Sequence, residues 1–336
     1  MSSAPVSTLP TRRVGPFEVS AIGLGCMNLS HAYQPRPSEQ DGEALLNEAI
    51  DLGVTFLDTA ALYGGGRNEE LVGRVLRTRR DEVVLASKGV MQLVDGTKVI
   101  DGRPEAIKRM CDESLRRLGV DVIDLYYLHR WDKQVPIAES VGAVAELVEQ
   151  GKVRAIGLSE VSVQRLGEAQ QVHPIAAVQN EYSLWTRNAE IAMIDACERD
   201  RIALVAFSPL GRGMLAGAVR DPQQLPAGDI RRPMPRFQSE NFGHNLALVD
   251  QLAELAREAG STPAQLSLAW LLKRSASVVP IPGTTSSEHL REDVAAAQVR
   301  LDEDLARRVD ELINQRTVAG PRYQDAQLDE VDAETF

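Results

Sequence analysis

The feature that most constrains this fold is a regular alternation of short apolar runs with longer segments whose apolar residues recur at helical spacing. The apolar runs predict strands at residues 21–25, 55–58, 83–87, 123–128, 153–158, 175–179, 202–207 and 277–281. Helical periods occupy residues 38–52, 67–77, 104–118, 138–150, 162–170 and 188–200. Because a helical crossover returns the chain parallel to the preceding strand, the pattern indicates a parallel sheet. Eight such strands predict an α/β fold, a (β/α)₈ TIM barrel.

Several segments extend this minimal barrel. Residues 11–20 predict an N-terminal β-hairpin that turns at 14–17. Residues 211–243 are rich in Gly, Pro and Arg without a clear period, which is typical of a long functional loop. Residues 245–259 predict an extra helix, and the acidic tail at 317–336 is interpreted as a solvated end. Since no low-complexity linker divides the chain, residues 1–336 are expected to form a single domain.

Charge and composition argue against several classes of function. The net charge is −11 and no basic run occurs, which disfavours nucleic acid or an anionic membrane as a partner. No apolar stretch approaches the ~18 residues that span a bilayer, and residues 1–10 lack the features of a signal peptide. The three cysteines, Cys26, Cys111 and Cys197, show no metal-ligand spacing and favour a reducing compartment. We therefore expect a cytoplasmic protein without a metal site.

Four polar residues stand at or just after the ends of these apolar runs. Asp58 ends one run and Tyr63 follows it, while Lys88 and His129 end the next two. Alone, each has a commoner structural explanation, such as a cap, a solvated amine or a buried imidazole. In a parallel barrel, however, the carboxyl ends of the strands meet at one face, where catalytic groups lie. The joint pattern therefore predicts one active site.

The residue types explain the chemistry that such a site performs. A free tyrosine has a pKa near 10, and a neighbouring ammonium such as Lys88 is expected to lower it by favouring the phenolate. Asp58 would keep Lys88 charged and fixed, and His129 would orient a carbonyl oxygen. Tyr63 would then protonate the alkoxide that forms as hydride reaches the carbonyl carbon. This is the chemistry of carbonyl reduction.

The order and content of these motifs resemble the aldo-keto reductase superfamily from about residue 14 to residue 297. The resemblance rests on Gly23-Leu-Gly-Cys-Met27, Asp58-Thr-Ala-Ala-Leu-Tyr-Gly64, Asn68-Glu-Glu-Leu-Val-Gly73, Ala86-Ser-Lys88, Asp124-Leu-Tyr-Tyr-Leu-His129, Gly151-Lys-Val-Arg-Ala-Ile-Gly-Leu-Ser159, Gln179-Asn-Glu-Tyr182, Ser208-Pro-Leu-Gly-Arg-Gly213 and Pro280-Ile-Pro-Gly-Thr284. Residues 157–160 and 181–185 are most similar to the branch that holds the perakine-reductase-like and pyridoxal-reductase-like enzymes. The resemblance implies hydride transfer from NADPH, with Tyr63 as general acid and Asp58, Lys88 and His129 as its partners.

The resemblance also implies a set of cofactor-binding residues. They are Ser159 and Gln179 at the nicotinamide amide, Phe207 stacked on its ring, Ser208, Leu210, Gly211, Arg212 and Gly213 along the pyrophosphate, and Thr285, His289, Glu292 and Asp293 around the adenosine. Three departures from the family pattern matter. Glu160 replaces a usual Asn, Asp293 replaces a common Asn, and His289 and Thr285 stand where many relatives carry Arg or Gln. Since a 2′-phosphate favours Arg, NADH is kept as an alternative to NADPH.

Weaker signals surround this site. Residues 211–216 fit the G-x-G-x-x-A fingerprint, but a Pro-rich stretch follows, so we expect a phosphate-facing loop of the barrel and not a Rossmann domain. Arg231 and Arg232 suggest a clasp over the cofactor, with a solvated loop or a subunit contact as the equal alternative. Met27, Trp131 and Trp185 follow strands and suggest an apolar substrate pocket. Cys26 is expected to be a small buried hydrophobe.

The sequence therefore predicts an NADPH-dependent reductase of aldehydes and ketones, with a small carbonyl compound as its partner. Two alternatives stay open. Some members of the superfamily are cofactor-binding regulatory subunits of ion channels, and the same site can also run as an alcohol dehydrogenase in the oxidative direction. Self-association into a homo-oligomer and the physiological substrate are not determined by these motifs, because specificity depends on loops.

Overall fold

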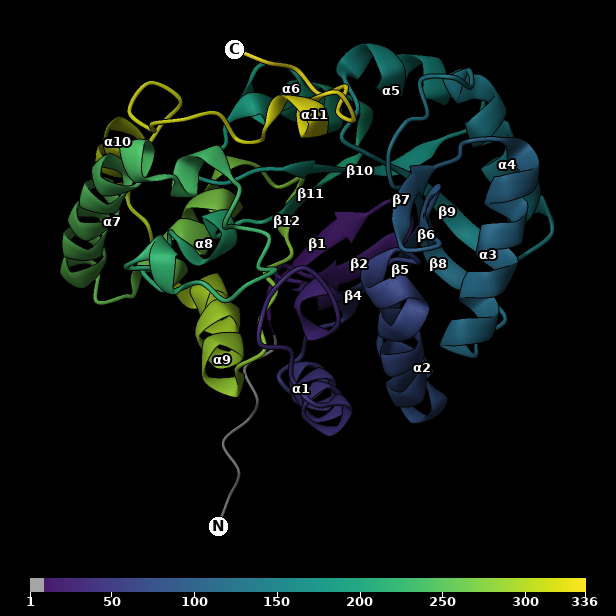
Figure 1. The fold of residues 1–336 in the computed structure, drawn as a ribbon, viewed down its shortest axis with the longest axis horizontal. Coiled ribbons are helices and arrows are strands. Elements are labelled where there is room, and N and C mark those ends of the chain that lie inside the picture. The colour runs from purple at the N-terminus through teal and green to yellow at the C-terminus, as the bar shows by residue number, and fades with distance from the viewer. Residues whose placement is uncertain (1–8) are drawn as a thin grey trace.

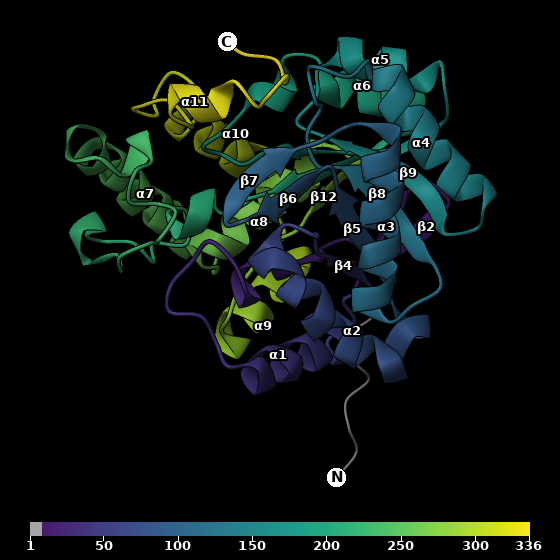
Figure 2. The same ribbon diagram turned by 45° about the vertical axis from the view of Figure 1, so that its right-hand side comes forward.

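A computed structural model describes residues 9–336. Eight parallel strands form one curled sheet in the order β12-β11-β10-β9-β8-β5-β4-β3 (Figures 1 and 2). Their bounds are β3 Leu24–Gly25, β4 Phe56–Asp58, β5 Val84–Gly89, β8 Ile123–Leu128, β9 Val153–Ser159, β10 Ile175–Glu181, β11 Ala203–Phe207 and β12 Val278–Pro280. All eight predicted strands are present, so the (β/α)₈ prediction is confirmed.

The two end strands of the sheet meet and close the barrel. The amide of Gly23 donates to the carbonyl of Pro280, and the amide of Gly25 donates to that of Pro282, each at 3.0 Å. Glycine is needed at this seam, since a Cβ on Gly25 would lie 2.9 Å from the carbonyl oxygen of Ile281. The seam brings the first and last strand ends to the same face as the strand ends between them.

Helices surround the sheet, as the helical periods predict. They are α1 Glu39–Asp51, α2 Arg67–Arg79, α3 Pro104–Leu118, α4 Ile137–Glu149, α5 Val163–Gln170, α6 Met193–Asp200, α7 Ser239–Glu258, α8 Pro263–Arg274, α9 Ser287–Ala295, α10 Glu303–Leu312 and α11 Asp325–Leu328. Local chemistry sets their ends. The Ser38 and Ser162 hydroxyls cap α1 and α5, and Gly119 ends α3 in a left-handed conformation.

The amino-terminal end of the barrel is covered by the predicted hairpin. Strands β1 Thr11–Val14 and β2 Phe17–Ser20 pair antiparallel. Val14 and Val19 are fully buried against side chains of the barrel interior, among them Phe56. The opposite, carboxyl end of the barrel is left free to form a cavity.

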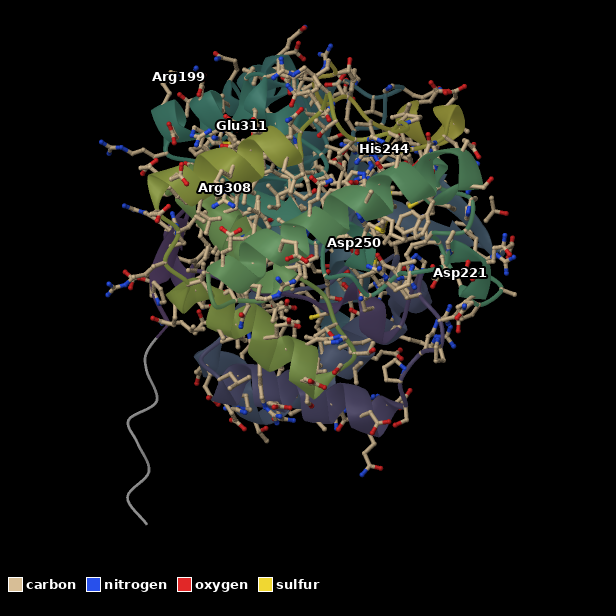
Figure 3. The ribbon with its side chains drawn as sticks, turned by 90° about the vertical axis from the view of Figure 1, so that its left-hand side faces the viewer. Arg199, Asp221, His244, Asp250, Arg308 and Glu311 are labelled. Carbon is tan, nitrogen blue, oxygen red and sulfur yellow. The ribbon has the colours of Figure 1, made fainter. Side chains whose placement is uncertain are left out.

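Two additions flank that carboxyl end. An antiparallel hairpin that the sequence patterns did not predict, β6 Met91–Val94 with β7 Thr97–Ile100, follows β5. The long loop after β11 contains only short 3-10 turns before α7 begins at Ser239. Figure 3 views the outer faces of α7 and α10, where Asp250 and Glu311 are exposed to solvent.

The acidic tail is not a solvated end, which corrects the sequence interpretation. The Asp332 carboxylate accepts hydrogen bonds from the Ser162 hydroxyl (2.8 Å) and amide (3.2 Å), and the Glu334 carboxylate accepts one from the Val163 amide (2.6 Å). These groups sit at the amino terminus of α5, where unpaired amides and the helix dipole favour anions. Figures 1 and 2 show the tail running beside this helix.

Two sequence predictions bear on localisation, one on a signal peptide and one on membrane-spanning segments. Residues 1–8, whose sequence suggested no signal peptide, lie outside the described residues. Within residues 9–336, none of the helices combines the length and the apolar character that crossing a bilayer requires.

Candidate active site

A cavity of about 610 Å³ opens at the carboxyl ends of the barrel strands. Its lining comes from the loops that follow β3, β4, β8, β11 and β12, from the ends of β9 and β10, and from the tail. The site predicted at the strand ends therefore coincides with a cavity. The lining includes Asp58, Tyr63 and His129, whereas Lys88 lies directly behind them.

The four predicted catalytic side chains meet at this cavity. The Lys88 ammonium is fully buried, makes a short ion pair with the Asp58 carboxylate, and donates to the Thr59 carbonyl at 2.9 Å. It also lies 3.2 Å from the Tyr63 hydroxyl. The His129 ring approaches the Tyr63 ring edge-on, with centroids 5.8 Å apart. One ammonium thus bridges the carboxylate and the phenol.

Backbone contacts between neighbouring strands fix this arrangement. The loop after β4 is tied to β5, because the Thr59 amide donates to Ala86 at 2.9 Å and the Ala61 amide donates to the Lys88 carbonyl at 3.1 Å. A 3-10 turn at Tyr63–Gly66 then places the phenol over the strand ends. The His129 amide is held by the Gly89 carbonyl at 3.2 Å. Each predicted catalytic residue is therefore positioned by the neighbouring strand and not by its side chain alone.

Burial decides the protonation of these groups. Burial raises the pKa of Tyr63, and the Lys88 charge only partly opposes it, so the net shift is upward. The ammonium lowers the pKa of Tyr63 as expected, but burial, which the sequence does not show, outweighs it and the phenol keeps its proton. Burial lowers the pKa of Lys88, but Asp58 and Tyr63 outweigh it and raise that pKa above its ordinary value. Lys88 stays charged at neutral pH.

His129 is a neutral imidazole at neutral pH. Burial lowers its pKa well below the ordinary value, and the charges of Lys88 and Arg130 add to that effect. Its Nδ1 has no hydrogen-bond partner among residues 9–336 although it is buried. A second imidazole, His31, lines the cavity and stacks on Tyr63 with ring centroids 5.8 Å apart. No strand end or motif marks His31 in the sequence, so it could not be predicted from these patterns.

The residues predicted at the nicotinamide end lie together beside the catalytic groups. Ser159, Gln179 and Phe207 all line the cavity. The Gln179 amide donates to the second Asp58 oxygen at 2.8 Å, so this side chain also supports the catalytic carboxylate. The carboxylate of Asp58 is thereby satisfied on both oxygens, one by Lys88 and one by Gln179.

Glu160 does not point into this cavity, which bears on its departure from the family pattern. Its carboxylate is buried, accepts the Glu181 amide at 2.8 Å and makes a short ion pair with Arg322 of the tail. Its backbone is left-handed, with φ +56°. Such a conformation costs a non-glycine residue of order 1–3 kcal/mol and persists only where the surroundings hold it. Glu160 anchors the tail at the strand end.

Glu160 belongs to a buried ionic network that joins the tail to the loop after β11. Arg322 contacts both Glu160 and Glu181, and Glu181 also pairs with Arg212 at 3.3 Å. Arg212 donates to the Tyr323 hydroxyl at 2.9 Å. Burial works to raise the pKa of Glu181, but Arg322, Arg212 and Arg236 outweigh it and lower the pKa to about 2. Glu181 is therefore ionised at neutral pH.

The predicted pyrophosphate loop follows β11 with one exception. Ser208, Leu210, Arg212 and Gly213 line the cavity, whereas Gly211 does not and lies against the Trp185 ring. Ser208 and Arg212 have left-handed backbones, with φ +49° and +60°, and Gly213 has φ +88°. These irregular residues turn the loop, and the Gly211 and Gly213 amides close it by donating to the Ser208 carbonyl at 3.0 Å and the Leu210 carbonyl at 3.1 Å.

The predicted adenosine residues line the far end of the cavity. Thr285, His289, Glu292 and Asp293 are all part of the lining, with Ser286 capping α9 through the His289 amide. Burial, helped by the Glu292 charge, raises the pKa of Asp293 to about 8. Two cations of this region, Arg291 and Lys273, are paired with protein carboxylates, Arg291 with Glu48 at 2.5 Å and Lys273 with Glu303.

The substrate end of the cavity differs in part from the prediction. Met27 lines it, together with Met91. Trp131 and Trp185 are outside the lining drawn by the described residues, which corrects that expectation. The Trp131 indole donates to the Val135 carbonyl and stacks under Arg165, and Trp185 is buried against Phe237. Both indole rings pack loops against helices.

Several cavity residues carry no signal that sequence patterns detect. They are Tyr33, Gln34 and Pro35 after β3, Lys98 on the β6–β7 hairpin, and Tyr323, Gln327 and Glu330 on the tail. Lys98 and Glu330 pair at 2.5 Å and so join the hairpin to the tail at the cavity. Such residues come from loops remote in sequence, which only the folded chain brings together.

The two arginines of the long loop that suggested a clasp differ in their position relative to the cavity. Arg231 lines the cavity, pairs with Asp229 at 2.8 Å and lies over the Tyr33 ring. Arg232 is outside the lining and donates to the Leu225 carbonyl. Only Arg231 is therefore placed for the clasp that the sequence suggested.

Burial raises the pKa of Cys26 to about 12, consistent with a buried hydrophobe and not a nucleophile.

Comparisons with known proteins place this geometry in a family. Residues 21–314 match the model of the aldo/keto reductase family. The chain is 43% identical to aldo-keto reductase yakc [NADP(+)] of Schizosaccharomyces pombe, across 94% of this chain and 95% of that one. It is also 43% identical to probable aldo-keto reductase 1 of Glycine max, across 91% and 89%.

Solved structures agree with these sequence matches. The glycerol dehydrogenase of Gluconobacter oxydans superposes with a TM-score of 0.84 at 27% identity, across 95% of this chain and 98% of that one. An aldo/keto reductase of Klebsiella pneumoniae in complex with NADP and acetate superposes with a TM-score of 0.72 at 30% identity, across 94% and 99%. With its barrel, its four meeting side chains and these matches, the chain belongs to the aldo/keto reductase family.

Proposed function

We propose that this protein reduces aldehydes and ketones to alcohols with NADPH, and that Tyr63 is the general acid. As a member of the aldo/keto reductase family it is an oxidoreductase. The observation that carries the proposal is the Lys88 ammonium, which is buried between the Asp58 carboxylate and a Tyr63 hydroxyl that faces the cavity. A phenol that keeps its proton beside a fixed ammonium is suited to donate that proton and to tolerate the phenolate left behind.

The residues present fit a nicotinamide dinucleotide. Polar side chains at one end (Ser159, Gln179), an aromatic face beside them (Phe207) and an irregular glycine-containing loop continue towards α9 along the same cavity. NADPH would supply the hydride when bound. Ser159 and Gln179 would hold the amide of the nicotinamide, Phe207 would stack on its ring, and the loop 208–213 would hold the pyrophosphate. The printed name of the S. pombe relative includes NADP(+), which supports this cofactor.

The chain's own residues then handle the carbonyl and the proton. The substrate oxygen would lie between the Tyr63 hydroxyl and the neutral His129 ring, which stand edge to face at 5.8 Å. His129 would donate a hydrogen bond that orients and polarises the carbonyl. Tyr63 would transfer its proton to the developing alkoxide, and Lys88, held by Asp58, would stabilise the phenolate. Asp58 is in turn fixed by the Gln179 amide at 2.8 Å.

The same residues can run the reaction in the oxidative direction, which is our second candidate function. The structural similarity to a glycerol dehydrogenase supports it. We further propose that the protein belongs to the perakine-reductase-like and pyridoxal-reductase-like branch, on the residues 157–160 and 181–185, and that residues 1–336 form one domain. A reducing cytoplasm, with abundant NADPH, would favour the reductive direction.

The test is consumption of NADPH and NADH by the purified protein with nitrobenzaldehyde, pyridoxal and phenanthrenequinone. Tyr63→Phe should lose at least ~10³-fold in kcat while the Kd of NADPH stays within about threefold, because the general acid is removed and the cofactor contacts are kept. Tyr126→Phe is the matched control, since Tyr126 is a buried tyrosine outside the cavity. Near-normal turnover of the Tyr63 variant would refute the mechanism.

A further inference from the structure

The basic side chains of the cavity differ in how their charge is balanced. Lysine and arginine residues in the lining are Lys98, Arg130, Arg212 and Arg231. Three of them have a carboxylate partner, with Lys98 on Glu330 at 2.5 Å, Arg212 on Glu181 at 3.3 Å and Arg231 on Asp229 at 2.8 Å. A paired guanidinium has its charge compensated before any ligand arrives. Arg130 is the exception.

Arg130 has no carboxylate within ion-pairing distance among residues 9–336. Its Nη1 donates to the carbonyl of His129 at 2.7 Å and approaches the Ser159 hydroxyl at 3.4 Å, and its Nε is buried without a partner. A guanidinium presents five N–H donors, so most of its donors are not used by the protein. Buried charges and donors normally find partners. An uncompensated arginine beside the cavity therefore calls for an anionic ligand.

We propose that Arg130 binds a carboxylate on the carbonyl substrate, so that the preferred substrates are carbonyl acids. This inference rests on the proposed function, because the anion is recognised next to the reacting carbonyl. Arg130 directly follows His129, and its charge acts on both His129 and Tyr63. An anion on Arg130 would accordingly lie close to the carbon that receives hydride. A 2-oxo acid or a short aldehyde acid has this spacing.

The net charge of the whole protein supports a short-range role for Arg130. With a net charge of −11, the protein has no long-range attraction for an anion. Selection for a carboxylate must then come from a short-range contact inside the cavity, where low polarity strengthens ionic hydrogen bonds. Arg130 supplies such a contact, whereas the other three basic side chains would first have to give up a protein carboxylate.

The experiment compares two substrates that differ in charge at one position. They are phenylglyoxylate, a 2-oxo acid, and its neutral methyl ester, assayed with NADPH for the wild type, Arg130→Gln, Arg130→Lys and the control Lys133→Gln. Lys133 lies on the same loop, outside the cavity, and contacts only the Val331 carbonyl. We expect the wild type to favour the acid in kcat/KM by roughly 10- to 100-fold, the range for a charged hydrogen bond.

Arg130→Gln should abolish that preference through a higher KM for the acid, Arg130→Lys should keep part of it, and the control should keep all of it. An unchanged acid-to-ester ratio in Arg130→Gln would overturn the proposal. So would an equal loss on both substrates with weaker NADPH binding, which would assign Arg130 to the nicotinamide amide. Failure of the proposed function looks different, since the wild type would then turn over neither substrate and Tyr63→Phe would change nothing.

Calorimetry adds a readout that does not need turnover. Benzoate and benzamide have nearly the same shape, and they are titrated into the protein saturated with NADP⁺. The wild type should bind benzoate at least ~10-fold more tightly, and Arg130→Gln should bind the two equally, because only the anion uses the guanidinium. Equal binding of the two ligands by the wild type would contradict the proposal whatever the kinetics give.

Discussion

Removal of Arg322 should destabilise the protein strongly, although this residue lies only fourteen positions before the end of the chain. Arg322→Ala leaves Glu160, whose side chain is fully buried, with only the Glu181 amide as a partner. Glu181 keeps Arg212 and the Thr186 hydroxyl at 3.0 Å. Breaking a buried ion pair by removing one partner costs about 3–5 kcal/mol. Because one of the two carboxylates stays compensated, we expect the low end, about 3 kcal/mol.

The assay is the free energy of unfolding from guanidinium denaturation at pH 7, with Arg316→Ala as the control. Arg316 is an exposed tail arginine whose side chain has no ion-pair partner within residues 9–336. The control should stay within about 0.5 kcal/mol of the wild type. Hydrogen exchange should show faster exchange at residues 320–334 in Arg322→Ala alone. A destabilisation below about 1 kcal/mol, with unchanged exchange in the tail, would refute the reasoning.

The stability difference between the wild type and Arg322→Ala should change in a defined direction as the pH falls. Glu181 has a folded pKa of about 2, below its ordinary value, so the unfolded chain binds its proton first as the pH falls. The stabilisation from this carboxylate is complete above about pH 5 and is lost as the pH falls towards 2. The difference between wild type and Arg322→Ala should therefore shrink on acidification. A difference that grows below pH 4 would contradict this assignment of charge.

Two further predictions concern buried positions. Asp293 has a folded pKa of about 8, so the folded chain keeps a proton that the unfolded chain releases near pH 4, and stability falls as the pH rises through that window. Asp293→Asn should gain stability over the wild type by up to about 4 kcal/mol between pH 5 and pH 9. Equal differences at both pH values would contradict it. Gly157→Ala should destabilise by about 1–3 kcal/mol, because its Cβ would lie 2.3 Å from the buried Tyr127 ring. Gly142→Ala, in an open position on α4, should instead be neutral or slightly stabilising in the same denaturation series, and equal costs would argue against the steric cause.

The strands and most barrel helices follow from local patterns, and those patterns have physical reasons. A strand buried on both faces reads as a mainly apolar run, as in Ile123–Leu128, where Asp124 is the one charged residue and which is predicted and observed with the same bounds. The β6–β7 hairpin was not predicted, because Met91–Val94 and Thr97–Ile100 are largely polar or exposed. Burial therefore imposes no apolar pattern on their sequences. The docking of the tail was not predicted, because its acidic residues look solvated in sequence, whereas Glu330 pairs with Lys98 and the Asp332 and Glu334 carboxylates accept hydrogen bonds at the amino terminus of α5.

That Asp58, Tyr63, Lys88 and His129 lie together could be predicted because each stands at or just after a strand end, where the fold itself brings neighbours together. The direction of the Tyr63 pKa could not, since the cost of burial depends on how much water the surrounding loops exclude. The same applies to Trp131 and Trp185, whose position after strands gave the correct end of the barrel but not the direction of the ring. Loop conformation depends on contacts between distant segments, which a single sequence does not encode locally.

The anchored tail has a consequence for incomplete chains. Arg322, Asp332 and Glu334 follow all four predicted catalytic residues in the sequence, yet they support one wall of the cavity. A product that ends before Arg322, through a premature stop codon or proteolysis, would retain all four catalytic side chains and the strands that carry them. Its substrate selectivity would nevertheless be altered, because Tyr323, Gln327 and Glu330 would be missing. An intact catalytic motif in a shortened gene is therefore insufficient grounds to assign it the activity of the full-length enzyme.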